Sequence, residues 1–183
     1  LNMLAAFREC GLFLQTGQRH SVDQILSSTG TIESNHRLIR RWLRNLSETD
    51  WLLTDGHDNE YILLREPSDG EAERRWEQLA QLEQKIHYSS ELLRYLRESG
   101  GHLQGLLRGE VDPLDLLFPQ GTMDTAVAAY NDNLVNRCMN AVVCAAVREI
   151  AQNRKHPRDS KRPLRILEIG AGVGGTSRAL IPA

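Results

Sequence analysis

The stretch that most constrains the fold of this chain lies near its end, at residues 164–183. Its first five residues, Leu164–Glu168, are mostly apolar, which is typical of a strand buried on both faces of a parallel sheet. Glycines then occupy every second position, at Gly170, Gly172 and Gly174, and a segment that can start a helix follows. The pattern predicts a strand, a tight glycine turn and a helix N-terminus, where backbone N–H groups can face a ligand at close range.

The kind of ligand depends on Glu168, two residues before the first glycine. Gly170, Gly172 and Gly175 also satisfy the dinucleotide pattern G-x-G-x-x-G, which alone is a weak signal. A carboxylate at the top of the strand would repel a pyrophosphate, whereas it could accept hydrogen bonds from an ammonium group. S-adenosylmethionine has an ammonium and a sulfonium group and no phosphate. We therefore expect this cofactor rather than a nucleotide; a glycine turn without a ligand is the remaining alternative.

The motif E-x-G-x-G-x-G, formed by Glu168 and the three alternating glycines, resembles the first motif of the class I S-adenosylmethionine-dependent methyltransferases. The resemblance implies that the C-terminal end begins a Rossmann-like α/β methyltransferase core. Such a core needs further strands and an acidic residue that binds the ribose hydroxyls. We expect these after Ala183, and because the chain starts at Leu1 without an initiator Met, we expect it to be a piece of a larger protein.

From about Leu106 onward the sequence is also similar to the methyltransferase domains of modular polyketide synthases and hybrid peptide synthetases. Those domains show an L-F-P-x-G phrase, a Tyr-containing helix and then the glycine motif, as do Leu117–Gly121, Tyr130 and Glu168–Gly174 here. The resemblance implies two kinds of partner: other domains of a synthase, and an acyl carrier protein whose phosphopantetheine arm holds the acyl substrate.

The resemblance also implies which residues bind the cofactor. In the resembled domains the helix that contains the Tyr lies under cofactor and substrate. Asn is a poor helix former, so Asn136 and Asn140 join Tyr130 as candidate pocket residues. The alternative is that Tyr130 belongs to the core and that the Asn side chains are solvated. The expected cofactor-binding residues are Glu168, Gly170, Ala171, Gly172, Gly174, Tyr130 and Asn140.

Residues 1–64 are expected to form a first unit. Apolar residues at helical spacing predict three helices, and two short apolar runs around a polar tip predict a β-hairpin. Three helices followed by a hairpin predict a winged helix, which the resemblance makes part of a lid. The helices are expected at 2–14, 22–28 and 33–49, and the strands at 51–54 and 60–64.

The third of these helices carries four arginines opposite its apolar arc, which raises the question of DNA binding. Residues 1–64 hold 6 Lys and Arg against 8 Asp and Glu, a net charge of −2, and the hairpin tip is acidic. A domain that binds duplex DNA normally carries a positive field, so we expect no nucleic-acid partner. The four residues are Arg37, Arg40, Arg41 and Arg44.

Residues 65–153 are expected to be helical, as the rest of the lid and the helix leading into the core. An apolar stripe predicts a long helix over 71–99, with a break near Ser89 and Ser90 as an alternative, and we interpret the stripe as a packing surface. Residues 154–183 then hold a basic loop, the first strand, the glycine motif and the first helix of the core. Further helices are expected at 102–108, from Pro113, and at 123–153.

The composition is ordinary for a soluble globular protein: 40% hydrophobic, 25% charged, with a net charge of −2. Cys10, Cys138 and Cys144 lie in apolar helical patterns without C-x-x-C spacing, which favours reduced thiols and a cytoplasmic location. No two histidines have the spacing of metal ligands, so no metal is expected. No apolar run approaches 18 residues, so we expect no membrane partner.

The fold expected is therefore mainly α with a small winged-helix-like β-hairpin and the beginning of a Rossmann-like α/β core. The function expected is that of the N-terminal part of a methyltransferase domain that methylates a carrier-bound β-ketoacyl intermediate at carbon. In the resembled family the base that removes the substrate proton is a His supported by a carboxylate. We expect both after Ala183, so no catalytic residue is assigned here and the piece alone is expected to be inactive. Three alternatives stay open: an O-methyltransferase, a non-catalytic or repurposed module of a synthase, and a winged-helix DNA-binding protein.

Overall fold

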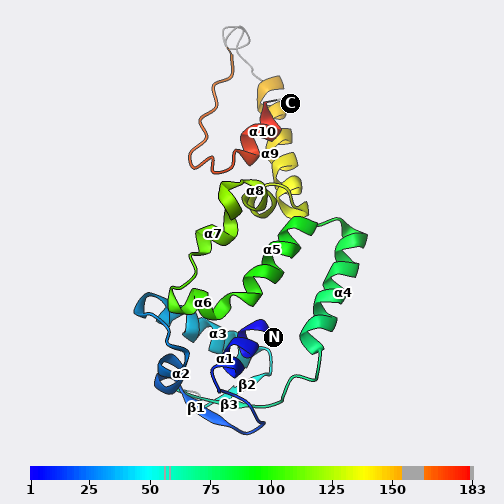
Figure 1. Cartoon of the computed structure of the whole chain (residues 1–183). Coiled ribbons are helices and arrows are strands. Elements are labelled where there is room, and N and C mark those ends of the chain that lie inside the picture. Colours follow the sequence, from blue (N-terminus) through cyan, green and yellow to red (C-terminus); the bar gives the residue numbers. More distant parts are fainter. Residues whose placement is uncertain (56, 58, 154–162, 182–183) are drawn as a thin grey trace. The chain divides into compact units, whose positions relative to one another are not determined.

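The computed structural model describes residues 1–55, 57, 59–153 and 163–181. The chain divides into two compact units, one made of Leu1–Leu79 with Leu96–Leu116 and the other of Ala80–Tyr95 with Leu117–Ala183. Helices α4 (Glu71–Ile86) and α5 (Ser90–Gly101) each contribute to both units (Figure 1). The division expected from the sequence instead placed its boundaries after residues 64 and 153.

The first unit confirms a helical fold with a small sheet. Its described strands pair antiparallel in the order β1-β3-β2, and Ile62 of β3 stands opposite Arg19 on one side and Leu53 on the other. The hairpin β2–β3 was expected, whereas β1 was not, because three residues are too few to show an alternating pattern. The elements are α1 (Asn2–Glu9), β1 (Arg19–Ser21), α2 (Val22–Thr29), η1 (Glu33–Asn35), α3 (His36–Glu48), β2 (Leu52–Thr54), β3 (Glu60–Leu63) and α6 (Leu103–Arg108).

The core of the first unit is built around aromatic contacts. Phe7 of α1 lies 5.9 Å from Phe13 and 6.0 Å from Trp42 of α3 between ring centroids. Leu107 of α6, distant in sequence, is buried in the same cluster. The apolar face of α3 is buried as expected except for Leu38, which is 39% exposed, and its four arginines are all exposed.

The alternative that placed a break near Ser89 and Ser90 is confirmed, because the segment expected as one long helix consists of two helices, α4 and α5. His87 ends α4 with a left-handed φ of 48°, and the Ser89 hydroxyl accepts a hydrogen bond from the Leu92 N–H at 3.3 Å where α5 begins. Gly100 and Gly101, which follow the expected end of the helix at residue 99, form the last two residues of α5. In the part of the chain that the structure describes, neither helix has a buried residue, so the expected packing stripe is not observed there.

The connection that follows agrees with the sequence. Helix α6 ends at Gly109, whose φ of +71° is accessible to glycine at little cost. Helix α7 (Pro113–Leu117) begins at a proline, and the Asp112 carboxylate accepts a hydrogen bond from the Leu114 N–H at 2.8 Å.

The single helix expected over 123–153 is broken between α8 and α9. Asn133 explains the break, because its side chain accepts a hydrogen bond from the Asn136 N–H at 3.0 Å and donates to the carbonyls of Ala128 and Ala129 at 3.1 and 3.0 Å. An Asn that bonds to the backbone in this way starts a new helix instead of continuing the old one. The helices of this unit are η2 (Pro119–Gly121), α8 (Asp124–Tyr130), α9 (Leu134–Gln152) and α10 (Gly175–Leu180).

The strand expected at Leu164–Glu168 does not form with the described residues. No described strand pairs with this segment, and the exposed fractions of Ile166 and Leu167 are 55% and 84%. A parallel strand needs the N–H and C=O groups of a neighbouring strand, which the described residues of this unit do not supply. Most of the expected basic loop, residues 154–162, lies outside the described residues.

Candidate functional site

The second unit contains a cavity of about 740 Å³ beside the glycine turn, which we define as residues 169–174. The volume lies within the range of small-molecule sites in proteins. The cavity is lined by Phe118, Met123, Ala126, Tyr130, Asn136, Met139, Asn140, Val143, Glu168, Gly170, Ala171, Gly172, Val173, Gly175 and Thr176.

The glycine turn has the open backbone that the sequence predicts. Gly170, Gly172 and Gly174 all have positive φ, of 75°, 55° and 73°, which other residues rarely adopt. The Gly174 N–H donates to the Ala171 carbonyl at 2.8 Å and closes the turn before α10. Among the described residues, apart from the immediate chain neighbours, no atom lies within 4 Å of a Cβ added at Gly170, and at Gly172 one atom does, at 3.9 Å. The turn is therefore a surface that a ligand could approach closely.

Glu168 lies directly before this turn and lines the cavity. Its Oε2 accepts a hydrogen bond from the hydroxyl of Ser177, which belongs to α10. Among the described residues, no group donates to its second oxygen, Oε1. The carboxylate is therefore held on one side and keeps an acceptor for a cationic ligand group on the other.

Tyr130 also lines the cavity, with 64% of its surface exposed, so the alternative that placed it in the core is wrong. Apolar side chains line the same cavity, including those of Phe118, Met139 and Val143. A cavity with an apolar wall and a few polar groups is typical of sites that bind organic cofactors.

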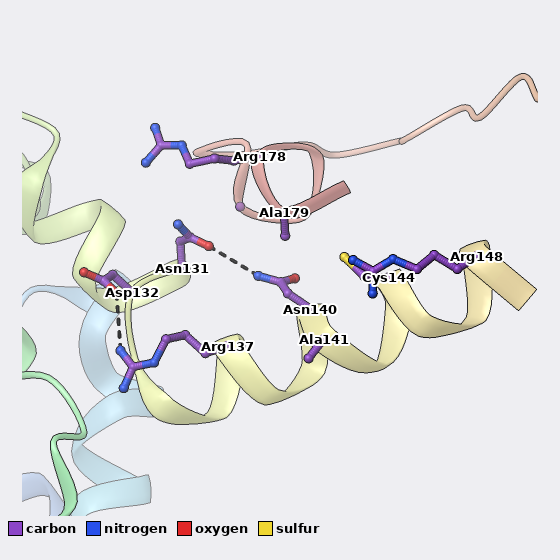
Figure 2. Close-up of a pocket in the computed structure, with 10 residues that line it drawn as sticks. Asn131, Asp132, Arg137, Asn140, Ala141, Cys144, Arg148, Arg178 and Ala179 are labelled. Carbon is purple, nitrogen blue, oxygen red and sulfur yellow. Dashed lines mark hydrogen bonds and ion pairs between the residues drawn. The ribbon is translucent and has the colours of Figure 1, made fainter. Parts of the chain in front are cut away.

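Asn140 joins α9 to the first turn of α10. Its Oδ1 accepts a hydrogen bond from the Thr176 hydroxyl at 3.1 Å. Its Nδ2 donates to Asn131 Oδ1 at 3.3 Å, the bond that Figure 2 shows. The alternative that left the Asn side chains in solvent therefore does not describe Asn140, nor Asn133, whose exposed fraction is 3%.

A second cavity, of about 430 Å³, lies between α9 and α10 (Figure 2). Asn140 and Gly175 line both cavities. Three arginines, Arg137, Arg148 and Arg178, line the second one, and the guanidinium of Arg137 is paired with Asp132 at 3.3 Å (Figure 2). We assign no ligand to it.

Six of the seven cofactor-binding residues predicted from the sequence line the larger cavity. The exception is Gly174, which shapes the turn without lining the cavity. Sequence analysis did not identify Thr176, Ser177 or Asn131 as parts of the site. Thr176 and Ser177 could have been predicted, because they are hydroxyl residues in the first turn of a helix that follows a glycine turn. The position of Asn131 depends on the unexpected break between α8 and α9.

Within the described residues, no group of three or more His, Cys, Asp or Glu side chains could hold a metal ion. The cysteines are not joined in disulfides, and Cys144 is the buried one. Of the helices described, none has both the length and the apolar character needed to cross a membrane.

Comparison with curated proteins finds relatives among large synthases, although no family model matches the chain. Pyochelin synthetase PchF of Pseudomonas aeruginosa is 32% identical and covers 83% of this chain. Polyketide synthase ThaQ of Burkholderia thailandensis is 30% identical and covers 99%. In both cases the chain spans only 8% of the relative's own length.

Comparison with solved structures finds two carbon methyltransferases. The DszA carbon methyltransferase matches 99% of this chain with a TM-score of 0.85 and 29% identity, and the CurJ carbon methyltransferase matches 99% with 0.78 and 27%. The chain spans 45% and 46% of these proteins. The matches confirm the resemblance to methyltransferase domains of synthases and the expected fold class.

Proposed function

We propose that this chain, a relative of the carbon methyltransferase domains of polyketide synthases and related synthetases, forms part of an S-adenosylmethionine-dependent methyltransferase site. The observation that carries the proposal is the cavity in which a carboxylate, Glu168, stands directly before an open glycine turn. S-adenosylmethionine, when bound, supplies an electrophilic methyl group on its sulfonium.

The residues of the cavity fit this cofactor better than a dinucleotide. Glu168 keeps one carboxylate oxygen for the methionine ammonium, and the same charge would repel a pyrophosphate. Gly170 and Gly172 leave room for close approach of the ligand to the backbone. The apolar side chains of Met139 and Val143 would exclude water from the less polar part of the ligand.

The substrate proposed is a β-ketoacyl chain on the phosphopantetheine arm of an acyl carrier protein, methylated at the carbon between the two carbonyls. Both solved neighbours are carbon methyltransferases, which supports carbon as the methylated atom. The described residues of the cavity include one carboxylate, which we assign to the ammonium of the cofactor, so the base that removes the substrate proton is not placed among them.

The test is methyl transfer by the full-length gene product, because this chain spans less than half of the solved carbon methyltransferases. The enzyme is given S-adenosylmethionine with a ¹³C-labelled methyl group and a β-ketoacyl thioester of pantetheine, and the product is analysed by NMR. We expect the label on the α-carbon. A substrate with two methyl groups already on that carbon should remain unlabelled.

Two outcomes would contradict the proposal. Label on an enol oxygen would mean an O-methyltransferase. The dimethylated substrate has no α-proton, so it could then be labelled only if its ketone enolises toward the distal carbon. Absence of label together with binding of NAD but not of S-adenosylmethionine would restore the dinucleotide interpretation. A Glu168→Ala variant is the matched control, since it retains the turn and removes the charge.

A further inference from the structure

A chain of hydrogen bonds connects the start of α10 to the corner between α8 and α9. The Thr176 hydroxyl donates to Asn140 Oδ1 at 3.1 Å. Asn140 Nδ2 in turn donates to Asn131 Oδ1 at 3.3 Å, as Figure 2 shows. Both polar ends of the Asn140 amide thus have partners within the protein. We call Asn131, Asn140 and Thr176 the asparagine latch.

The latch is reinforced by a close contact at Gly175, the first residue of α10. Gly175 does not have positive φ, so its backbone does not require glycine. An added Cβ, however, would stand 2.7 Å from Asn131 Oδ1, 3.0 Å from its Cγ and 3.2 Å from its Cβ. Rotation of the Asn131 side chain would relieve the contacts with Oδ1 and Cγ, but not the 3.2 Å contact with Cβ, which is fixed to the backbone. Glycine therefore leaves the space that this close approach uses, and the first residue of α10 packs directly against Asn131.

The corner that carries Asn131 is held independently of α10. The Asn131 N–H donates to the Val127 carbonyl at 2.8 Å, and Asn133, which is almost fully buried, ties α8 to α9. Tyr130, the residue before Asn131, lines the larger cavity. The corner therefore places a residue that lines the cavity, Tyr130, directly before a residue of the latch, Asn131.

We propose that Asn131 is a positioning residue for the cofactor site: through the latch and its contact with Gly175, it fixes the glycine turn against the wall that carries Tyr130. Asn131 is not among the residues that line the larger cavity, so it acts through Asn140 and Thr176. The part of the proposal that concerns the cofactor rests on the proposed function. The latch itself does not.

The latch is tested first by hydrogen exchange on the 183-residue chain. The probes are two backbone amides: that of Gly174, which donates to the Ala171 carbonyl in the glycine turn, and that of Arg178, which donates to the Gly174 carbonyl in α10. Asn131→Leu removes the acceptor and should speed exchange of both amides about three- to tenfold, the loss of one net hydrogen bond. Asn131→Asp keeps an acceptor for Asn140 and should stay within about twofold of the parent.

A second pair of variants protects the test against misfolding of the first. Thr176→Val removes the hydroxyl at nearly constant shape and should speed exchange like Asn131→Leu, whereas Thr176→Ser keeps the hydroxyl and should not. Asn153→Ala, at the far end of α9, is the control for a general loss of Asn. Unchanged exchange in both Asn131→Leu and Thr176→Val would overturn the latch.

The positioning role is tested by calorimetric titration of S-adenosylmethionine into the full-length gene product. Asn131→Leu should weaken binding about three- to tenfold and Asn131→Asp should restore it. Adding Thr176→Val to Asn131→Leu should cost little more, because both break the same chain. If Asn131→Leu exchanges its amides faster but binds S-adenosylmethionine as tightly as the parent, Asn131 is not a positioning residue for the cofactor site. A parent protein that does not bind the cofactor would instead overturn the proposed function, leaving the exchange results to decide the latch.

Discussion

The hydroxyl of Ser177 donates a hydrogen bond to Glu168 Oε2 across the glycine turn. The bond joins the residue that enters the turn to the helix that leaves it, so the direction of the carboxylate is set by the protein before a ligand binds. Ser177 is not among the residues that line the cavity. Orientation and charge at this position therefore belong to two different residues and can be altered separately.

Removing the Ser177 hydroxyl that orients the Glu168 carboxylate is expected to have a modest effect on cofactor affinity. Ser177→Ala leaves the Glu168 charge in place but frees its side chain, and the affinity of the full-length protein for S-adenosylmethionine should fall about two- to tenfold, the range of one hydrogen bond. Ser177→Thr keeps the hydroxyl and should bind like the parent. Calorimetric titration measures both. Equal losses in the two variants would show that the hydroxyl does not orient the carboxylate.

Removing the charge is expected to have a larger effect. Glu168→Ala should lose a charge-assisted hydrogen bond of roughly 1.5–3 kcal/mol, about ten- to a hundredfold in affinity. Glu168→Gln keeps the shape of the side chain without its charge, so its affinity for S-adenosylmethionine should lie between those of the parent and Glu168→Ala. A dinucleotide site predicts tighter binding of NAD by Glu168→Ala, because the substitution removes a negative charge beside the pyrophosphate. Titrating both variants with both cofactors separates the two; tighter NAD binding by Glu168→Ala would reject the methyltransferase interpretation.

The 183-residue chain alone is expected to bind S-adenosylmethionine only weakly. It corresponds to 45% of the DszA carbon methyltransferase, and its cavity has no carboxylate besides Glu168 among the described residues to bind the ribose hydroxyls. Calorimetry on this chain should therefore give no binding at micromolar concentrations. Micromolar affinity would mean that this segment already contains all the residues that the cofactor requires.

The parts of the site that sequence alone predicted are those fixed by local backbone geometry. The alternating glycines can be assigned because positive φ is rare in other residues, and all three have it. Ser21 is a similar case outside the site: it directly precedes the helix expected at 22–28 and forms a complete capping box with Gln24. These features need only neighbouring residues to form.

The parts that sequence did not predict depend on groups distant in the chain. Leu164–Glu168 is apolar enough for a buried strand, but a strand forms only where a neighbour completes its hydrogen bonds. The place of Asn131 follows from the α8–α9 break, which apolar spacing does not reveal because the pattern continues across it. The contact between Asn131 and Gly175 joins residues 44 positions apart, and no local rule indicates it.

The exposed arginines of α3 are expected not to bind duplex DNA. The first unit holds 11 Lys and Arg against 17 Asp and Glu, a net charge of −6, so its field opposes a polyanion. A mobility-shift assay with a 20-base-pair duplex at about 150 mM salt should show no complex. A complex that weakens steeply with salt and disappears when Arg37, Arg40, Arg41 and Arg44 are replaced by Ala would contradict the absence of a nucleic-acid partner.

The stability of the first unit should fall in acid because of His20. Its Nε2 accepts a hydrogen bond from the Phe13 N–H at 3.3 Å, and its ring meets that of Phe13 edge-on at 4.9 Å between centroids. Burial lowers the pKa of His20 below its usual value near 6.5. The unfolded chain therefore binds the proton more readily, so this contribution to the free energy of unfolding is complete above about pH 6.5 and is lost as the pH falls below it.

In His20→Gln the amide oxygen can still accept from Phe13 and does not titrate. Urea unfolding between about pH 8 and 5 should show a smaller loss of stability in this variant than in the parent, and equal losses would show that His20 is not responsible.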